Sequence, residues 1–336
     1  MKKRLLYLIF LTFMCFVITQ VSIGKTVITV GTMAPRESIW GQVFIEINAD
    51  LIKESDGQLE LRPFFNRAEQ QLVELIKTGR SDAVSLTGSG LGNILPEAFI
   101  FPLPLLFSTY EELDYVRGKL ARRFEQLLEK EGYVLLGWGD FGFIYLFSKI
   151  PIRTQTDLRE TLFWAWDLDP VAKEFVSASG GEPVVLAIQT VLSSLKEDQV
   201  QTVYNSPLAC IALGWHTQVK YMSDFPLAAG IGATIISKRK YHGLSDKHQR
   251  LLREITRKHH EQLIKTARSN SEKSIDALKE QGIEVIPIPP GEREKWSQVA
   301  RQVQDHFAGK GKDKLYEEEL LDEVRSLLSE YRGKRF

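Results

Sequence analysis

Residue types that carry out covalent or metal chemistry stand in no recognisable catalytic arrangement in this sequence. It contains no G-x-S-x-G, C-x-x-C or H-E-x-x-H pattern and no G-x-G-x-x-G that opens a helix. All six histidines lie at or after His216, and the neighbours His259 and His260 would point about 100° apart on a helix, which disfavours a shared metal ion. We therefore expect these two on a solvated helix face, and we expect no enzyme activity, metal site or cofactor.

Aromatic side chains are the strongest candidates for ligand contact. They combine a large apolar area with a polar edge that can orient a ligand, although any single one is more often a core residue. Phe141, Phe143 and Tyr204 accompany the tryptophans in sequence. Most tryptophans fall at expected strand ends, loops or helix starts, where cleft walls form in α/β lobes: Trp40, Trp138, Trp164, Trp166 and Trp215.

A glycine-rich segment, Gly88-Ser89-Gly90-Leu91-Gly92, follows an expected strand. Its backbone N–H groups could face an anion at the strand end. An equally good interpretation is a turn that needs positive φ angles. Ser89 stays a candidate ligand contact in either case.

Strands and helices alternate along most of the chain. A β-branched strand from Thr26 precedes apolar residues at helical spacing between Ile39 and Leu51, and further strands are expected at 59–65 and 82–87. In the middle, 133–138, 143–148, 162–166, 183–186 and 200–204 read as strands of a second sheet. This alternation predicts mostly parallel sheets with helices on their faces.

The C-terminal third has a different character. A long polar helix is expected from Ser245, with apolar residues on one side, followed by a strand at 283–288 and an amphipathic helix over 315–328. No Gly/Pro/Ser-rich linker separates the two sheets. We expect two lobes that share the chain, with a ligand cleft between them that closes by hinge bending.

The N-terminus is typical of an export signal. Lys2, Lys3 and Arg4 precede an apolar run, and small residues end at Gly24, so cleavage is expected before Lys25 and the mature protein in the periplasm. An uncleaved membrane anchor is the alternative. Basic and acidic residues number 43 each, which gives no reason to expect nucleic-acid binding. Cys210, in an apolar segment, reads as a buried small hydrophobe.

Over nearly all of the predicted mature chain, the sequence resembles the solute-binding proteins of TRAP transporters, of the dicarboxylate-binding (DctP) type. No single motif is diagnostic, but their order is. The matching segments are Gly31–Pro35 with Ser38–Gly41, Leu75–Gly79 with Asp82-Ala83, Phe101–Phe107, Gly137–Gly139 with Phe147–Lys149, Pro151–Thr154 with Asp157-Leu158, and Tyr204–Pro207.

The resemblance implies a two-lobed periplasmic-binding-protein fold of type II-like topology, a long helix that braces both lobes, and delivery of a ligand to a sodium-coupled membrane permease. It also implies that Asn205 faces the ligand. The expected lobes are 25–148 with 234–272 and 149–233 with 273–336.

One departure from the family changes the expected ligand. The family usually carries an arginine that binds a ligand carboxylate on the strand after Asp157-Leu158, and here Trp164 stands in its place. An ionised carboxylate buried without a cation is strongly disfavoured. We therefore expect a small hydrophobic or aromatic ligand, with a carboxylate still allowed. The candidate contacts are Trp40, Ser89, Trp138, Phe143, Trp164, Trp166 and Asn205.

Other interpretations remain open at this point. Arg67 or Arg153 could supply the missing charge, although both lie in polar stretches, and a cationic ligand could be held by cation–π contacts, helped by Asp140 or Asp167. A periplasmic hydrolase would lack a nucleophile and base. A ligand-binding signalling or lipid-carrier module, docking on a helical-repeat partner, would present the same cleft.

Overall fold

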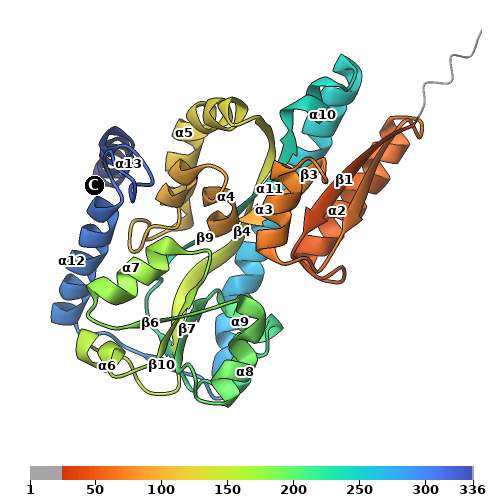
Figure 1. Ribbon diagram of the computed structural model, residues 1–336. Helices are drawn as coiled ribbons and strands as arrows, with labels where there is room; N and C mark the ends of the chain where they lie inside the picture. The colour runs from red at the N-terminus through yellow and green to blue at the C-terminus, as the bar shows by residue number, and fades with distance from the viewer. Residues whose placement is uncertain (1–24, 335–336) are drawn as a thin grey trace, which may run out of the picture.

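The computed structural model describes residues 25–334 (Figure 1). The predicted export signal, residues 1–24, lies outside the described residues. Among the residues that are described, no helix combines the length and the apolar character that a membrane span requires.

The first lobe is built on three parallel strands. β1 (Thr26–Thr32) lies between β2 (Leu59–Phe64) and β3 (Ala83–Thr87). The connecting helices are α2 (Ile39–Glu54) and α3 (Glu69–Lys77). In α2 the buried side chains include Val43, Phe44, Ile47 and Leu51, the apolar spacing seen in the sequence.

Two long antiparallel strands join the lobes. β4 (Tyr133–Ser148) and β9 (Ala228–Ser237) pair with each other. The main strand order is β2-β1-β3-β9-β4, followed by β7 (Thr202–Asn205), β5 (Phe163–Trp166) and β6 (Pro183–Leu186). The sequence predicts two short strands where the structure has the single β4, and this prediction was wrong. The strand continues through two register shifts, at Leu135/Gly137 and Asp140/Gly142, and Gly142 takes a φ of +95°.

The second lobe repeats the alternation of strands and helices. β5 (Phe163–Trp166) pairs in parallel with β6 (Pro183–Leu186) and β7 (Thr202–Asn205), and β8 (Tyr221–Ser223) pairs in parallel with β10 (Glu284–Ile286). Its short helices are α6 (Gln155–Arg159), α7 (Pro170–Ala178), α8 (Val191–Lys196) and α9 (Pro207–Ala212). Cys210 is buried, as predicted, and burial raises the pKa of its thiol.

The predicted long helix is confirmed as α11 (Asp246–Glu280), which begins after α10 (Lys238–His242). Ser245 caps its N-terminus by accepting a hydrogen bond from the backbone N–H of His248. α11 contacts α2 in the first lobe, β4 between the lobes and α9 in the second. In Figure 1 it runs from the upper part of the molecule to the lower part behind β4 and β9.

The histidine pair on α11 does not lie on a solvated face, so that prediction was wrong. His260 is buried between strands and helix, where its ring contacts the Thr234 hydroxyl at 2.8 Å and the Thr256 carbonyl at 2.7 Å. His259 is largely covered and pairs with Asp50 at 2.9 Å. A helix that packs across a whole sheet buries a wider face than the number of its charged residues suggests.

Two C-terminal helices pack on opposite lobes. α12 (Pro290–His306) contacts α7, whereas α13 (Glu318–Gly333), the predicted terminal helix, contacts α5 (Tyr110–Lys130). They form the edge on the left of Figure 1. Because α5 belongs to the expected first lobe, the chain crosses between lobes once more near its end. The exact lobe boundaries stay a prediction.

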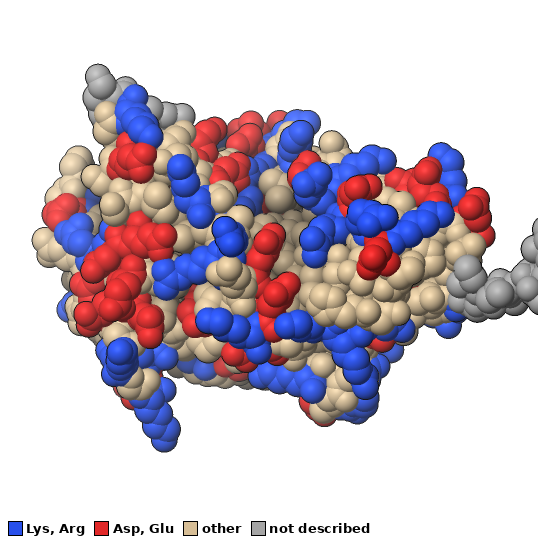
Figure 2. Space-filling model, turned by 90° about the horizontal axis from the view of Figure 1, so that it is seen from above, with Lys and Arg blue, Asp and Glu red and all other residues tan. Residues whose placement is uncertain are grey.

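Charge is evenly distributed over the visible surface. Figure 2 shows basic and acidic side chains side by side over much of the face that it presents. This agrees with the equal numbers of basic and acidic residues in the sequence.

Candidate functional site

A cavity of about 520 Å³ lies where the carboxyl ends of the parallel strands of both lobes meet. Residues at the ends of β1 and β3 line it from the first lobe, and residues at the ends of β5 and β7 line it from the second. β4 and β9 pass behind it. Crevices at carboxyl strand ends are the usual ligand sites of open α/β sheets, and this volume falls in the range of small-molecule sites.

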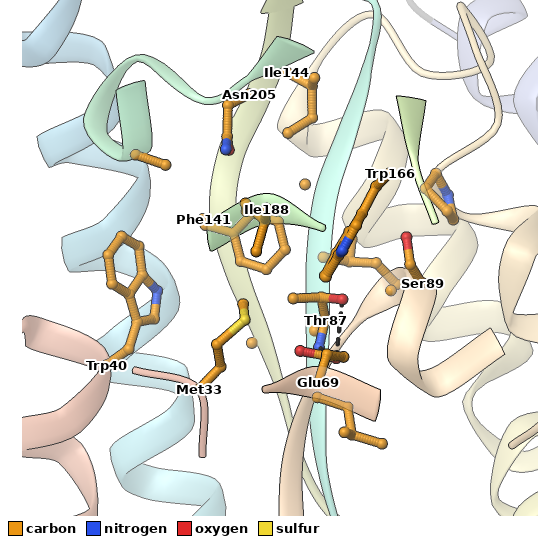
Figure 3. A pocket seen from close by; sticks show the side chains of 18 of the residues that line it. Met33, Trp40, Glu69, Thr87, Ser89, Phe141, Ile144, Trp166, Ile188 and Asn205 are labelled. Atoms are coloured by element: carbon orange, nitrogen blue, oxygen red, sulfur yellow. Dashed lines mark hydrogen bonds between the residues drawn. The ribbon is translucent and has the colours of Figure 1, made fainter. Parts of the chain in front are cut away.

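Most side chains around the cavity are apolar. Figure 3 shows Met33 and Trp40 on one side, Trp166 and Ser89 on the other, and Phe141 and Ile188 between them. Further apolar lining residues are Phe44, Ile144, Phe163, Val171, Phe175, Leu213, Leu227 and Ile231. A cavity of this composition favours ligands with a large apolar surface.

Five of the seven candidate residues line this cavity: Trp40, Ser89, Trp164, Trp166 and Asn205. Ser38 caps α2 and so fixes the start of the helix that carries Trp40, whose indole N–H donates to the Asp140 carbonyl at 3.2 Å. Asn205 ends β7, and its Oδ1 accepts from the Ser206 N–H at 2.9 Å. That bond leaves the Asn205 side-chain N–H groups for a ligand.

Trp164, which is expected from the sequence to stand in place of the family's arginine, is packed firmly into the second lobe. Its ring stacks on Tyr204 at 4.9 Å and meets Trp215 edge-on at 5.2 Å, and only 1% of the residue is exposed. Its indole N–H donates to the Leu186 carbonyl at 2.9 Å. Trp164 is therefore a firmly packed member of the cavity wall, and Trp166, at the end of the same strand, lines the cavity as well.

The structure places Trp138 and Phe143 outside the lining of the large cavity. Trp138 packs against Phe101, and Phe143 stacks on Tyr110 beside a smaller hollow of about 250 Å³. The register shift at Asp140/Gly142 explains why Phe143 does not face the large cavity. One extra residue in β4 turns the next side chain to the opposite face of the sheet. Phe141 and Ile144 face the cavity in its place.

The glycine-rich segment forms a short helix, α4 (Gly88–Gly92), and none of its glycines has a positive φ. The expected positive-φ turn was therefore wrong. Gly90 has another reason to lack a side chain, since a Cβ there would fall 1.9 Å from Oε1 of Glu69. This glycine lets a helix and a carboxyl group approach each other closely.

Glu69 is a lining residue that sequence reasoning missed. It is 2% exposed, and its Oε1 accepts from the Thr87 backbone N–H at 2.7 Å and the Thr87 hydroxyl at 3.0 Å. Oε2 is buried and has no hydrogen-bond partner within residues 25–334. Burial raises the pKa of Glu69 to about 7, against the lowering effect of the two bonds from Thr87. A glutamate in the first turn of a polar helix reads as solvated, and no sequence signal marks it.

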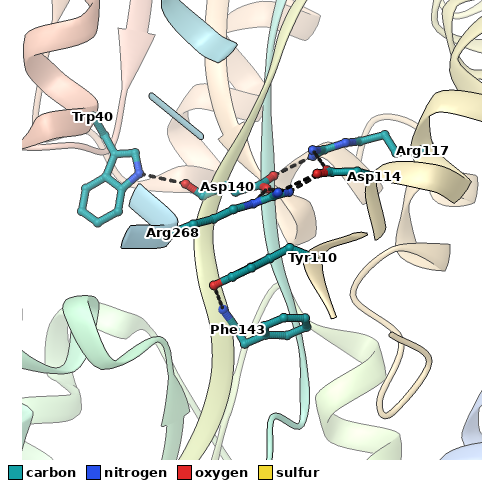
Figure 4. Close-up of polar contacts among 7 residues, drawn as sticks. All are labelled: Trp40, Tyr110, Asp114, Arg117, Asp140, Phe143 and Arg268. Atoms are coloured by element: carbon teal, nitrogen blue, oxygen red, sulfur yellow. Dashed lines mark hydrogen bonds and ion pairs between the residues drawn. The ribbon is translucent and has the colours of Figure 1, made fainter. Parts of the chain in front are cut away.

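Asp140, at the back of the cavity, is held by two arginines (Figure 4). Arg117 donates to Oδ1 at 2.6 Å, and Arg268 donates to Oδ2 at 2.8 Å through Nε. Both arginines also bind Asp114. Although burial opposes the charged form, Asp114 and Asp140 raise the pKa of Arg268. Asp140 is thus a fully paired carboxylate, and it does not offer its charge to a cationic ligand.

The remaining charged groups differ in their access to the cavity. Arg67 is exposed and belongs to the lining, where its guanidinium lies 5.9 Å from the centre of the Phe64 ring. Arg153 is exposed and is not part of the lining. Asp169 accepts from the Tyr204 hydroxyl at 3.0 Å, and burial raises the pKa of its carboxyl. Within residues 25–334 no group of three or more His, Cys, Asp or Glu side chains is placed to hold a metal ion.

Comparison with known proteins identifies the family of this chain. Residues 30–310 match the model of the DctP family, described as bacterial extracellular solute-binding protein, family 7. The chain is 27% identical to the uncharacterized protein YiiZ of Salmonella typhimurium over 49% of this chain and 48% of that protein, so this match spans about half the length of the relative.

Solved structures share the fold over almost the whole chain. DctP7 of Bordetella pertussis, an extracytoplasmic solute receptor binding pyroglutamic acid, has a TM-score of 0.80 at 20% identity, covering 89% of this chain and 99% of that one. A TRAP periplasmic solute-binding protein of Shewanella oneidensis with bound succinate has a TM-score of 0.81 at 14% identity, covering 91% and 100%.

Proposed function

The chain belongs to family 7 of the bacterial extracellular solute-binding proteins, the DctP family of TRAP-type receptors, and from this we propose that it captures a small hydrophobic or aromatic ligand. The family consists of binding proteins rather than enzymes. The ligand, which can carry a carboxylate, occupies the cavity between the lobes and is delivered to the membrane subunits of a TRAP permease. The protein works in the periplasm after its signal is removed.

The observation that carries this proposal is the apolar wall around the cavity. The resemblance implies that Trp164 stands where the family places a cation, and its indole N–H donates to the Leu186 carbonyl. The ligands named for the two similar structures are small carboxylic acids. In this chain the wall around Trp164 supplies aromatic and aliphatic surface, and Arg67 supplies the one exposed cation among the described lining residues.

Native mass spectrometry of the protein from Lys25 tests the proposal. The mass of the protein as purified is compared with its mass after denaturation and refolding, and any released compound is identified. An apolar or aromatic compound that is lost on refolding supports the proposal. A polar dicarboxylate in the cavity would contradict the ligand class while leaving the binding function in place.

A matched pair of variants assigns the ligand to this cavity. Ile188→Gln places a polar group in the lining and should weaken binding of an apolar probe such as 3-phenylpropanamide by at least about tenfold, a typical cost of burying a polar group. Val185→Gln makes the same kind of change on the neighbouring strand at an exposed side chain outside the lining. Equal effects of the two variants would place the ligand elsewhere.

A further inference from the structure

One polar atom at the cavity lacks the partner that its burial demands. Oε2 of Glu69 is buried without a hydrogen bond, whereas Oε1 of the same carboxyl group already accepts two. Buried polar atoms in native proteins almost always have a partner, so an exception calls for an explanation. Figure 3 shows the Glu69 side chain beside Thr87 among the lining residues.

We propose that Glu69 is the residue that recognises the polar end of the ligand: Oε2 carries a proton and donates a hydrogen bond to a carbonyl or carboxylate oxygen of an otherwise apolar molecule. This inference rests on the proposed function of the cavity. It specifies that the ligand must carry an acceptor oxygen and that Glu69 is the group that binds this oxygen.

The two carboxyl oxygens of Glu69 differ in their hydrogen bonds, and this difference supports the assignment. Both bonds from Thr87 reach Oε1, so Oε1 is the acceptor-only oxygen and the proton belongs on Oε2. No basic side chain is bonded to the carboxyl group, and burial raises its pKa to about 7. A neutral acid is therefore available as a donor at pH 6 to 7, and it becomes an anion above that range.

The neighbouring elements hold Glu69 in this position. Thr87, at the end of β3, fixes Oε1, and its hydroxyl also accepts from the Gly90 N–H at 3.2 Å at the start of α4. Gly90 leaves the space that the carboxyl group occupies. The donor is thus held by backbone of the first lobe, and the aromatic wall faces it from the second.

Other titratable or charged lining groups behave differently over pH 6 to 8.5. Asp140 is bound by Arg117 and Arg268. His260, whose pKa burial lowers to about 4, stays neutral. Asp169, bonded to Tyr204 on the opposite lobe, has a raised pKa, so it needs its own control.

Three probes with the same apolar body separate the possible polar ends: 3-phenylpropanamide, 3-phenylpropanoate and 3-phenylpropylamine. Their binding is measured by titration calorimetry at pH 6 and pH 8.5. A pKa near 7 predicts that the amide, which does not titrate, binds roughly 30-fold more weakly at pH 8.5. The carboxylate should lose affinity in the same direction, and the amine should bind more weakly than the amide at pH 6.

Variants identify the group responsible. Glu69→Gln keeps an acceptor for Thr87 and offers an N–H donor at every pH, so its affinity for the amide should not change with pH. Glu74→Gln, an exposed glutamate on the same helix, and Asp169→Asn should both retain the pH dependence. A pH response that survives Glu69→Gln, or that disappears in Asp169→Asn, overturns the assignment.

A measurement on the unmodified protein covers the case in which a variant does not fold. The carboxyl carbon resonance of Glu69 should report a protonated group up to pH 8 in the amide complex. Amide binding that is independent of pH, or an amine that binds more tightly than the amide at both pH values, overturns the inference but leaves the cavity as the ligand site. Failure of all three probes to bind contradicts the proposed function, and the inference with it.

Discussion

Two buried carboxyl groups at the same cavity differ in their partners. Asp140 is 1% exposed and binds two arginines that themselves share Asp114. Glu69 is 2% exposed and binds only the N–H and hydroxyl of Thr87. The same burial therefore accompanies a carboxyl group with both oxygens paired at the back of the cavity and a carboxyl group with one unpaired oxygen at its first-lobe wall.

This difference separates a structural carboxylate from one that is available to a ligand. The partners of Asp140 come from α5 and α11, so its ion pairs tie two helices to the strand that joins the lobes (Figure 4). The partner of Glu69 comes from the end of β3, and among the described residues Oε2 has no hydrogen-bond partner. Removal of either carboxyl group should thus have distinct consequences.

The largest effect is expected for Asp140→Ala. It leaves Arg117 and Arg268 without their buried acceptor, and breaking such a pair costs about 3 to 5 kcal/mol of the free energy of unfolding. Urea denaturation followed by circular dichroism measures this loss. Asp114→Asn, at a half-exposed site of the same network, is the control and should cost clearly less. Equal losses would show that Asp140 has no special structural role.

The second-largest effect is expected in the free energy of unfolding, which should depend on pH because Glu69 titrates. Because the pKa of the folded state is raised from 4.5 to about 7, the neutral group contributes stability that is complete below about pH 4.5 and is lost as pH rises through 7. Relative to Glu69→Gln, the unmodified protein should lose about 3 kcal/mol of unfolding free energy between pH 4.5 and pH 8.5. Denaturation curves of both proteins across this range provide the measurement. A constant difference between the two proteins would remove the contrast with Asp140.

A smaller loss is expected for Gly90→Ala. The new Cβ would collide with Glu69, and overpacking of this kind costs about 1 to 3 kcal/mol. Gly118→Ala is the matched control, because nothing lies within 4 Å of a Cβ at this exposed helical position, and it should stabilise the protein by about 0.5 to 1 kcal/mol. Thermal unfolding of the two variants should shift in opposite directions. Tolerance of Gly90→Ala would mean that Glu69 is free to move.

The smallest effect is expected for Glu323→Gln, which removes an exposed ion pair between α13 and Arg123 of α5. Exposed pairs contribute about 0 to 1 kcal/mol, since water screens them. This variant sets the scale for an ion pair that bridges two helices without burial. A loss as large as that of Asp140→Ala, measured by the same urea denaturation, would mean that burial is not what makes the Asp140 pairs strong.

The sequence predicts local elements of this fold better than their long-range pairing. Apolar spacing locates α2, α11 and α13, because periodicity records which helix face is buried. The continuity of β4 was missed, because the sequence pattern suggested two short strands, at 133–138 and 143–148. The partners that make it one strand are β9, β7 and β8, which lie far along the chain.

The residues of the candidate site could likewise be predicted only in part from the sequence. Trp40, Trp166 and Asn205 follow or end strands, so their position near the carboxyl ends can be read from the sequence. Phe143 points away because of a bulge that only strand pairing reveals. The role of Glu69 depends on Gly90 and Thr87, about 20 residues away, and no pattern in helix α3 indicates it.

Strand β4, which both lobes share, also determines how the molecule unfolds. Residues 133–144 of β4 pair with β9, the other strand that joins the lobes, and its last residues pair with β7 and β8 of the second lobe. If either half melted, the other would be left with a bare edge of unpaired N–H and C=O groups. The lobes are therefore one cooperative unit in unfolding, and a fragment cut at the lobe boundary would be prone to aggregate.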